Sequence, residues 1–239
     1  MGLRAFGNAT VRLVLGTGLS TPQQDIELSS AALAGLAAPD TEIDGSWLRV
    51  HRPAPTAAFS RMDALAPGHA HAAAAASKHG FAPILRPAGG RLAAYHRDAL
   101  VLDLVARHPE PHRHIRERFA QLGGWLVDVL TELGVDARLG EVAGEYCPGE
   151  FSVNAGGKTK LVGTAQRVTR LGFLISAVLL VADPEPVRAV LTDAYPLLGL
   201  AWDPTTVGCV ADSVPGVTTD EVRDAILARL PRLLPGVDH

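Results

Sequence analysis

The sequence predicts an α+β fold in which helices flank one mixed, largely antiparallel sheet. Runs with strand periodicity and runs with helix periodicity are mixed along the chain, without the steady strand–helix alternation of a parallel sheet. The chain has 239 residues, of which 47% are hydrophobic and 20% charged, so it can bury a core without disulfides or metal ions. We therefore expect a single domain over residues 1–239.

Caps and periodicity predict the elements of the first third of the chain. Thr21 and Pro22 can begin a helix, because proline suits the first helical position. The alternation over residues 47–52 predicts a half-buried strand that ends at the prolines after it. The alanine-rich run 69–79 favours a helix by propensity.

A hairpin is predicted next, with a strand at 83–86, a turn at Gly89 and Gly90, and a returning strand at 91–95. Residues 115–133 are the strongest helix candidate, because apolar side chains recur there at spacings of three and four residues. The other predicted elements are strands at 135–142 and 173–182, a helix at 185–192, and a last helix that begins at a Thr-x-x-Glu capping box at Thr218.

A cysteine loop and the hairpin after it form the candidate site. Cys147 lies in a Pro/Gly loop, and a Gly-Gly turn at 156–157 then leads into a lysine-bearing strand that is expected to break at Gly163. Such a hairpin can bring a thiol and an ammonium together, which favours thiolate, the nucleophilic form. Lys158 and Lys160 share one face of this strand, so register alone leaves both as candidates for the ammonium.

Composition argues against several classes of protein. The formal net charge is −3, so no general affinity for nucleic acid is expected. Two cysteines make neither a disulfide framework nor a zinc cluster, which favours a reduced, cytoplasmic protein. We expect no signal peptide, and the longest apolar run, 173–182, is too short to span a bilayer. Neither cysteine nor clustered carboxylate completes the pairs His69/His71 and His112/His114, so no metal site is predicted.

Two segments of the chain resemble a known family. Residues 160–167 (Lys-Leu-Val-Gly-Thr-Ala-Gln-Arg) resemble the lysine motif of the lipoate-protein ligase and octanoyltransferase family, which shares its catalytic fold with biotin-protein ligase. Residues 86–96 (Arg-Pro-Ala-Gly-Gly-Arg-Leu-Ala-Ala-Tyr-His) resemble the glycine-rich loop of the same family, and the resemblance spans roughly residues 23–230. Pro87 and Arg91 depart from the pattern, because the family has an arginine and a glycine there.

The resemblance implies roles for particular residues. In cysteine-dependent members a cysteine upstream of the lysine motif carries the acyl group, which makes Cys147 the expected nucleophile. The Lys-x-x-Gly spacing selects Lys160, whose ammonium would bond the acyl carbonyl and stabilise the developing oxyanion. Cys209 is the alternative nucleophile, because another branch places its cysteine after the lysine. The expected substrate-binding residues are Arg86, Gly89, Gly90, Tyr95, His96, Ser152, Gly163, Thr164, Ala165 and Gln166.

The resemblance also implies an activity. An acyltransferase would move an octanoyl or lipoyl group from a thioester donor, such as acyl carrier protein, through Cys147 to the lysine of a lipoyl carrier domain. That carrier would be the glycine cleavage H protein or a dehydrogenase E2 domain. No cofactor would be required, and a monomer without nucleic-acid or membrane partners is expected, lacking the C-terminal accessory domain that many ligases carry.

Two other functions compete with this one. An ATP-dependent lipoate-protein ligase would act through an acyl-adenylate, with ATP and magnesium, and would not need Cys147. A catalytically silent member would only bind acyl groups or carrier proteins.

Overall fold

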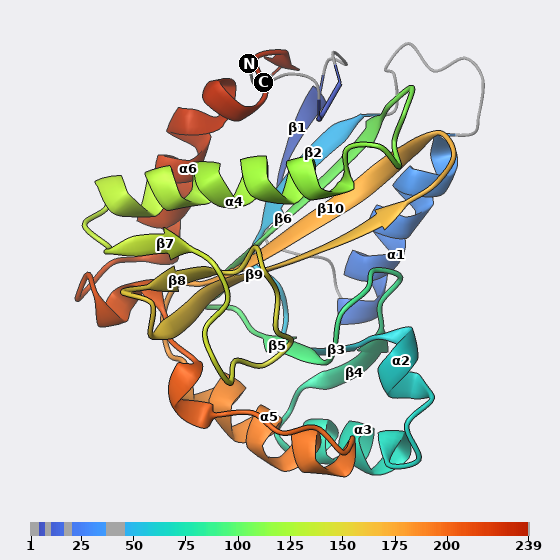
Figure 1. Cartoon of the computed structure of the whole chain (residues 1–239), viewed down its shortest axis with the longest axis vertical. Helices are drawn as coiled ribbons and strands as arrows, with labels where there is room; N and C mark the ends of the chain where they lie inside the picture. The colour runs from blue at the N-terminus through green and yellow to red at the C-terminus, as the bar shows by residue number, and fades with distance from the viewer. Residues whose placement is uncertain (1–4, 8–10, 17–20, 37–45, 239) are drawn as a thin grey trace.

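A computed structural model describes residues 5–7, 11–16, 21–36 and 46–238 (Figure 1). Its centre is an eight-stranded mixed sheet in the order β11-β1-β2-β6-β10-β9-β8-β7, with helices on both faces. A second sheet of three strands, β4-β3-β5, lies below one end of the first. The predicted fold class, a mixed sheet flanked by helices, is confirmed, while the division into a large and a small sheet was not predicted.

In the large sheet, β1 runs parallel to β2 and to β11, and all other neighbours are antiparallel. Its strands are β1 (Val11–Gly16), β2 (Trp47–His51), β6 (Ala99–Arg107), β7 (Ala137–Leu139), β8 (Val153–Ala155), β9 (Thr159–Val168), β10 (Gly172–Leu180) and β11 (Val237–Asp238). The small sheet is formed by β3 (Thr56–Phe59), β4 (Ala82–Leu85) and β5 (Ala93–Tyr95). The α-helices are α1 (Pro22–Gly35), α2 (Arg61–Ala64), α3 (His69–Lys78), α4 (Ile115–Glu132), α5 (Glu185–Leu197) and α6 (Thr219–Leu233).

One face of the large sheet packs against α4 and α6 (Figure 1) and forms the main core. The three- and four-residue spacing in α4 places Leu122, Leu126 and Val129 in that core, as the sequence predicts. Gly134 adopts a φ of 100° after the helix, a conformation that favours glycine. The capping box of α6 is also confirmed, because Thr218 and Glu221 bond each other's backbone N–H groups.

The opposite face of the large sheet is covered by different elements. Helix α1 packs there through Leu33 against Val105 and Leu174. Thr21 caps this helix with its side chain, as predicted, by accepting a bond from the N–H of Gln24. A separate core lies between the small sheet and helices α3 and α5, which lie side by side. The candidate site lies on this face, between the small sheet and the large one. None of the described helices is long and apolar enough to cross a bilayer.

The predicted hairpin of residues 83–86 and 91–95 is wrong in its pairing. Both segments are strands, but β3 lies between them, parallel to β4 and antiparallel to β5. The end of the strand before Pro53 is confirmed, because β2 ends at His51, and the unpredicted strand β3 begins at Thr56 directly after Pro55. Proline is compatible with the residue before a strand, so these residues mark a boundary between β2 and β3.

Three further strand expectations need correction. Strand β9 does not break at Gly163 but continues to Val168, and the local irregularity is a register shift at Val153/Asn154 in β8. The strand expected at 135–142 is only the three-residue β7. Strand β2 is buried rather than half-buried, because helices cover both faces of the sheet. Buried strands of this kind, including the unpredicted β6, lack the alternation that reveals a half-exposed strand.

Candidate active site

The cysteine loop connects β7 to β8 and holds Cys147 in a left-handed backbone conformation, with φ at 43°. A non-glycine residue in this region costs on the order of 1–3 kcal/mol and persists only where its surroundings enforce it. Here the N–H of Cys147 donates to the Tyr195 hydroxyl at 2.7 Å, and its carbonyl accepts from Lys160 Nζ at 2.9 Å. Tyr195 donates in turn to the Leu92 carbonyl at 2.8 Å, so α5 ties the cysteine loop to the glycine-rich loop.

The thiol of Cys147 faces the glycine-rich loop. The backbone N–H of Arg91 lies 3.2 Å from the sulfur, and Nη2 of Arg86 lies 3.7 Å from it. Both groups are hydrogen-bond donors, and the second is cationic. A Cβ at Gly90 would lie 2.9 Å from this sulfur, and only a residue without a side chain allows the approach.

Lys160 is buried and hydrogen-bonds the cysteine loop. Its ammonium donates to Glu145 Oε1 at 3.1 Å, to the Tyr146 carbonyl at 3.0 Å and to the Cys147 carbonyl. These three bonds use all three of its protons. The sequence predicts an ammonium beside the thiol of Cys147, but in the structure the ammonium contacts the carbonyl of that residue, and it is the guanidinium of Arg86 that lies 3.7 Å from the sulfur.

Glu145 is the partner that the sequence analysis missed. Its side chain is fully buried, and Oε1 also accepts bonds from the N–H of Gly149 at 3.0 Å and from the Ser152 hydroxyl at 2.6 Å. Its other oxygen accepts from the N–H of Val142 at 3.2 Å. The carboxylate therefore binds both ends of the cysteine loop to the lysine. Its place two residues before Cys147 was visible, but an acidic residue in a loop is ordinarily exposed, and nothing local indicates its burial.

A cavity of about 370 Å³ opens beside the thiol. Apolar side chains of Phe119, Phe151 and Val178 form part of its wall, and the segment of β9 from Gly163 to Gln166 forms another. Ten of the twelve residues predicted from the sequence line it together: Cys147, Lys160, Arg86, Gly89, Gly90, Ser152, Gly163, Thr164, Ala165 and Gln166. A Cβ at Gly163 would lie 3.4 Å from Lys160 Cε, so the glycine of the Lys-x-x-Gly spacing lies against the lysine side chain.

Two predicted residues lie elsewhere. Tyr95 lines a smaller neighbouring cavity, and His96 lines neither of the two. The ring of His96 accepts from the N–H of Asp98 at 3.2 Å and donates to the Asp183 carbonyl at 2.9 Å, so both nitrogens are engaged by backbone. Gln166 lines the cavity, but its side-chain amide is already hydrogen-bonded: the oxygen accepts from Arg118 Nε and the nitrogen donates to the Ile115 carbonyl. In this conformation the polar atoms of His96 and Gln166 are therefore hydrogen-bonded within the protein.

The two candidate lysines differ in burial in the structure, and so do the two candidate cysteines. Lys158 is exposed in the β8–β9 turn, whereas Lys160 is buried. Cys209 lies in the core beneath the small sheet, where burial raises the pKa of its thiol to about 11. Cys147 is partly exposed at the cavity. Within the described ranges, no group of three or more His, Cys, Asp or Glu side chains is arranged to hold a metal ion.

Comparison with known proteins gives consistent results. Residues 66–230 match the family model of the lipoyl protein ligase A/B catalytic domain. An octanoyl-[GcvH]:protein N-octanoyltransferase of Geobacillus kaustophilus is 26% identical over 128 residues, which are 54% of this chain and 45% of that protein. The protein of the same name from an Exiguobacterium species is 30% identical over 121 residues, 50% of this chain and 42% of its own. The matches therefore span less than half the length of these curated relatives.

Among solved structures, a lipoate-protein ligase A bound with ATP superposes with a TM-score of 0.72. The sequence identity is 20%, and the superposition covers 95% of this chain and 86% of that one. At this identity the similarity establishes a common fold.

The two glycines of the glycine-rich loop provide a matched test of the thiol environment. In Gly90→Ala the new Cβ would meet the Cys147 sulfur and Arg86 Nη2, at a backbone φ of 101° that disfavours any side chain. Because the thiol would be displaced from its donors, we expect its alkylation rate at neutral pH to fall about tenfold or more. Gly89→Ala meets nothing within 4 Å and should leave the rate unchanged. Equal effects of the two substitutions would contradict this geometry.

The two thiols should differ sharply in reactivity with iodoacetamide. With its pKa raised to about 11, Cys209 holds roughly one part in 10⁴ of thiolate at pH 7, and its thiolate appears only as the pH rises toward 11. Peptide mass mapping at pH 7 should therefore show carboxamidomethylation at Cys147 well before Cys209. Preferential labelling of Cys209 in the folded protein would show that the cysteine environments are misassigned.

Proposed function

Because this chain belongs to the lipoyl protein ligase A/B catalytic domain family, we propose that it is a cysteine-dependent protein acyltransferase. It would carry an octanoyl or lipoyl group from a thioester donor to the lysine of a lipoyl carrier domain. The observation that carries this proposal is the thiol of Cys147, held at the cavity by an enforced backbone conformation and flanked by two donors. A ligase that forms an acyl-adenylate has no need of a thiol in this position.

The first step is acylation of the enzyme. The Cys147 thiolate attacks the thioester carbonyl, a carbon–sulfur bond forms, and the bond to the donor sulfur breaks. The departing donor thiolate takes up a proton and leaves as a thiol. One thioester replaces another, so the step is nearly balanced and needs no nucleotide. The Arg91 N–H and the Arg86 guanidinium contact the sulfur that makes this attack.

The second step is transfer to the acceptor. The ε-amine of a carrier-domain lysine attacks the Cys147 thioester, an amide bond forms, and the carbon–sulfur bond breaks. The amine loses a proton and the released cysteine thiolate takes one up, so the enzyme returns to its starting state. Amide formation makes the overall transfer favourable. The apolar wall of the cavity suits a medium-length acyl chain through both steps.

Lys160 contributes to both steps by fixing the backbone of Cys147. Its ammonium must exchange one of its three present partners before it can donate to an acyl carbonyl. One of the three partners, the carbonyl of Cys147, belongs to the same residue as the reacting sulfur. A small movement of the cysteine loop would break the hydrogen bond between this carbonyl and the Lys160 ammonium. Under this proposal Lys160 holds the loop before acylation and supports the oxyanion during it.

The names of the relatives bear on the partners. The two bacterial relatives are octanoyl-[GcvH]:protein N-octanoyltransferases. We therefore propose an octanoylated carrier protein as donor, either acyl carrier protein or the glycine cleavage H protein, and a lipoyl domain of a dehydrogenase E2 subunit or the H protein as acceptor.

The test is intact-protein mass spectrometry after incubation with octanoyl-acyl carrier protein in the absence of nucleotide. We expect one octanoyl adduct, removed by neutral hydroxylamine, which cleaves thioesters. Cys147→Ser should abolish the hydroxylamine-sensitive adduct, and Cys209→Ser should retain it. A strict requirement for ATP with release of pyrophosphate would instead identify a ligase, and loss of the adduct only in Cys209→Ser would move the nucleophile.

A further inference from the structure

An open groove of about 450 Å³ adjoins the cavity of the cysteine, between helix α1 and the ends of strands β4 and β9. Helices α1 and α2 lie together on this side of the molecule (Figure 1). Arg61 of α2, Arg86 and Arg167 line the groove. Glu27 supplies the one carboxylate among the described residues of its lining, and it accepts from Gln23 Nε2 on its own helix at 2.7 Å. The lining therefore carries a net positive charge.

The three arginines of this groove have no carboxylate partner among the described residues. Arg167 Nη1 donates to the Pro87 carbonyl at 3.3 Å, and Arg86 Nη2 donates to the Arg91 carbonyl at 2.7 Å. The Nε of Arg86 is buried, and it has no hydrogen-bond partner in the part of the chain that the structure describes. Guanidinium groups suit phosphate, because phosphate oxygens accept parallel N–H bonds from their planar edge. The groove thus has the chemistry of a phosphate site.

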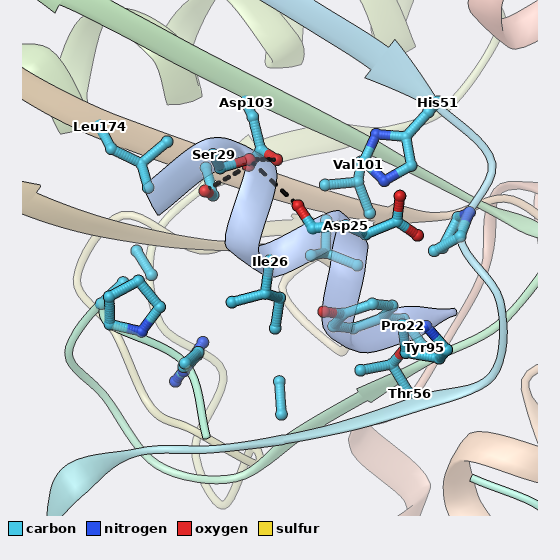
Figure 2. A pocket seen from close by; sticks show the side chains of 18 residues that line it. Pro22, Asp25, Ile26, Ser29, His51, Thr56, Tyr95, Val101, Asp103 and Leu174 are labelled. Atoms are coloured by element: carbon cyan, nitrogen blue, oxygen red, sulfur yellow. Dashed lines mark hydrogen bonds between the residues drawn. The ribbon is translucent and has the colours of Figure 1, made fainter. Parts of the chain in front are cut away.

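The two carboxylates of the smaller cavity that Tyr95 lines do have partners (Figure 2). Asp103 accepts from the Ser29 hydroxyl at 2.7 Å, and Asp25 accepts from Arg49 Nη2 at 2.6 Å. These bonds join helix α1 to the large sheet. Packing of α1 therefore accounts for the charged residues of the smaller cavity, but it provides no partner for the arginines of the groove.

The groove begins where the cavity of the cysteine ends. Gln166 of β9 lines the cavity and Arg167, the next residue, lines the groove, while Arg86 lines both. From Gly163 at the cavity to Arg167, the strand advances roughly 13 Å. An extended pantetheine arm spans about 15 Å between its phosphate and its sulfur, by the reach of an extended chain. A thioester at Cys147 and a phosphate in the groove are thus separated by about the length of this arm.

We propose that the groove binds the phosphate of a phosphopantetheine-bearing acyl donor while the thioester of that donor reaches Cys147. The proposal rests on the proposed function and specifies how its donor is recognised. Arg61 and Arg167 bind the phosphate oxygens, and the dimethyl group of the arm packs on Leu85, which is 54% exposed at the end of β4. An acyl group carried on a protein lysine has no such phosphate, so the groove favours acyl carrier protein over the glycine cleavage H protein as donor.

The test compares two donors that differ only in this phosphate, octanoyl-4′-phosphopantetheine and octanoyl-pantetheine, in the absence of nucleotide. The rate at which each acylates Cys147 is followed by intact mass at low donor concentration. We expect the phosphorylated donor to react about tenfold or more faster, because a charge-assisted hydrogen bond contributes about this factor. The two thioesters have the same intrinsic reactivity, and the advantage should shrink as added salt screens the arginines.

Arginine variants locate the phosphate. Arg61→Gln and Arg167→Gln should each bring the ratio of the two rates to less than about threefold, and should slow acylation by octanoyl-acyl carrier protein about tenfold. Arg170→Gln is the matched control, because Arg170 is exposed in the turn after β9 and does not line the groove, so its ratio should equal that of the wild type. The ratio within one preparation is independent of how much protein is folded.

Several results would overturn the proposal while the function stands. The two small donors could react equally fast in the wild type, or the preference and the rate with octanoyl-acyl carrier protein could persist in both Arg61→Gln and Arg167→Gln. Acylation of Cys147 by octanoylated H protein and by none of the phosphopantetheine donors would do the same. Absence of an adduct from every donor, or pyrophosphate release from octanoate and ATP that falls in Arg61→Gln, would overturn the proposed function itself.

Discussion

The buried ion pair between Glu145 and Lys160 is the interaction on which the site depends. The lysine belongs to β9 inside the large sheet, whereas the glutamate belongs to a loop without regular structure. Their side chains are almost fully buried, and each charge is satisfied by several further hydrogen bonds. Removing one member of such a pair costs about 3–5 kcal/mol, because the other charge stays buried without a partner. The ion pair thus fixes the cysteine loop to strand β9 of the large sheet.

The thiol is positioned by elements far apart in the sequence. Lys160 holds the Cys147 carbonyl, Tyr195 of α5 holds its N–H, and the N–H of Arg91 meets its sulfur. Burial raises the pKa of the Tyr195 phenol, so this hydroxyl stays protonated and keeps both of its hydrogen bonds. The left-handed backbone of Cys147 is the conformation in which these contacts are made together, and its conformational cost is offset by them.

Features that depend on a single segment of the chain, such as helix caps and helical periodicity, were predicted from the sequence. The caps at Thr21 and Thr218 and the apolar periodicity of α4 lie within single segments, and the structure confirms those helices. The cysteine loop, the glycine-rich loop and the start of β9 were also identified as cavity-forming segments. The pairing of strands was not predicted correctly. Strand β3 lies between β4 and β5, and such an order depends on contacts between residues that are distant in the sequence.

The missed site residues share a physical reason. Glu145 acts through burial, Arg91 through a backbone N–H that any residue but proline supplies, and Tyr195 through a helix 48 positions beyond the cysteine. Tyr95 ends β5 and lines the smaller cavity, whereas both ring nitrogens of His96, the next residue, bond backbone groups of Asp98 and Asp183, and only these distant contacts separate the two residues.

Hydrogen exchange of the loop peptide covering residues 144–150 tests the central role of the ion pair most directly. In Glu145→Gln and in Lys160→Met, we expect this peptide to lose protection about tenfold or more relative to β10, because the bonds to Gly149 N–H and to the loop carbonyls weaken. Lys158→Met, a change at the exposed lysine nearby, should exchange like the wild type. Wild-type protection of the loop in Lys160→Met would show that the ion pair does not hold the cysteine in place.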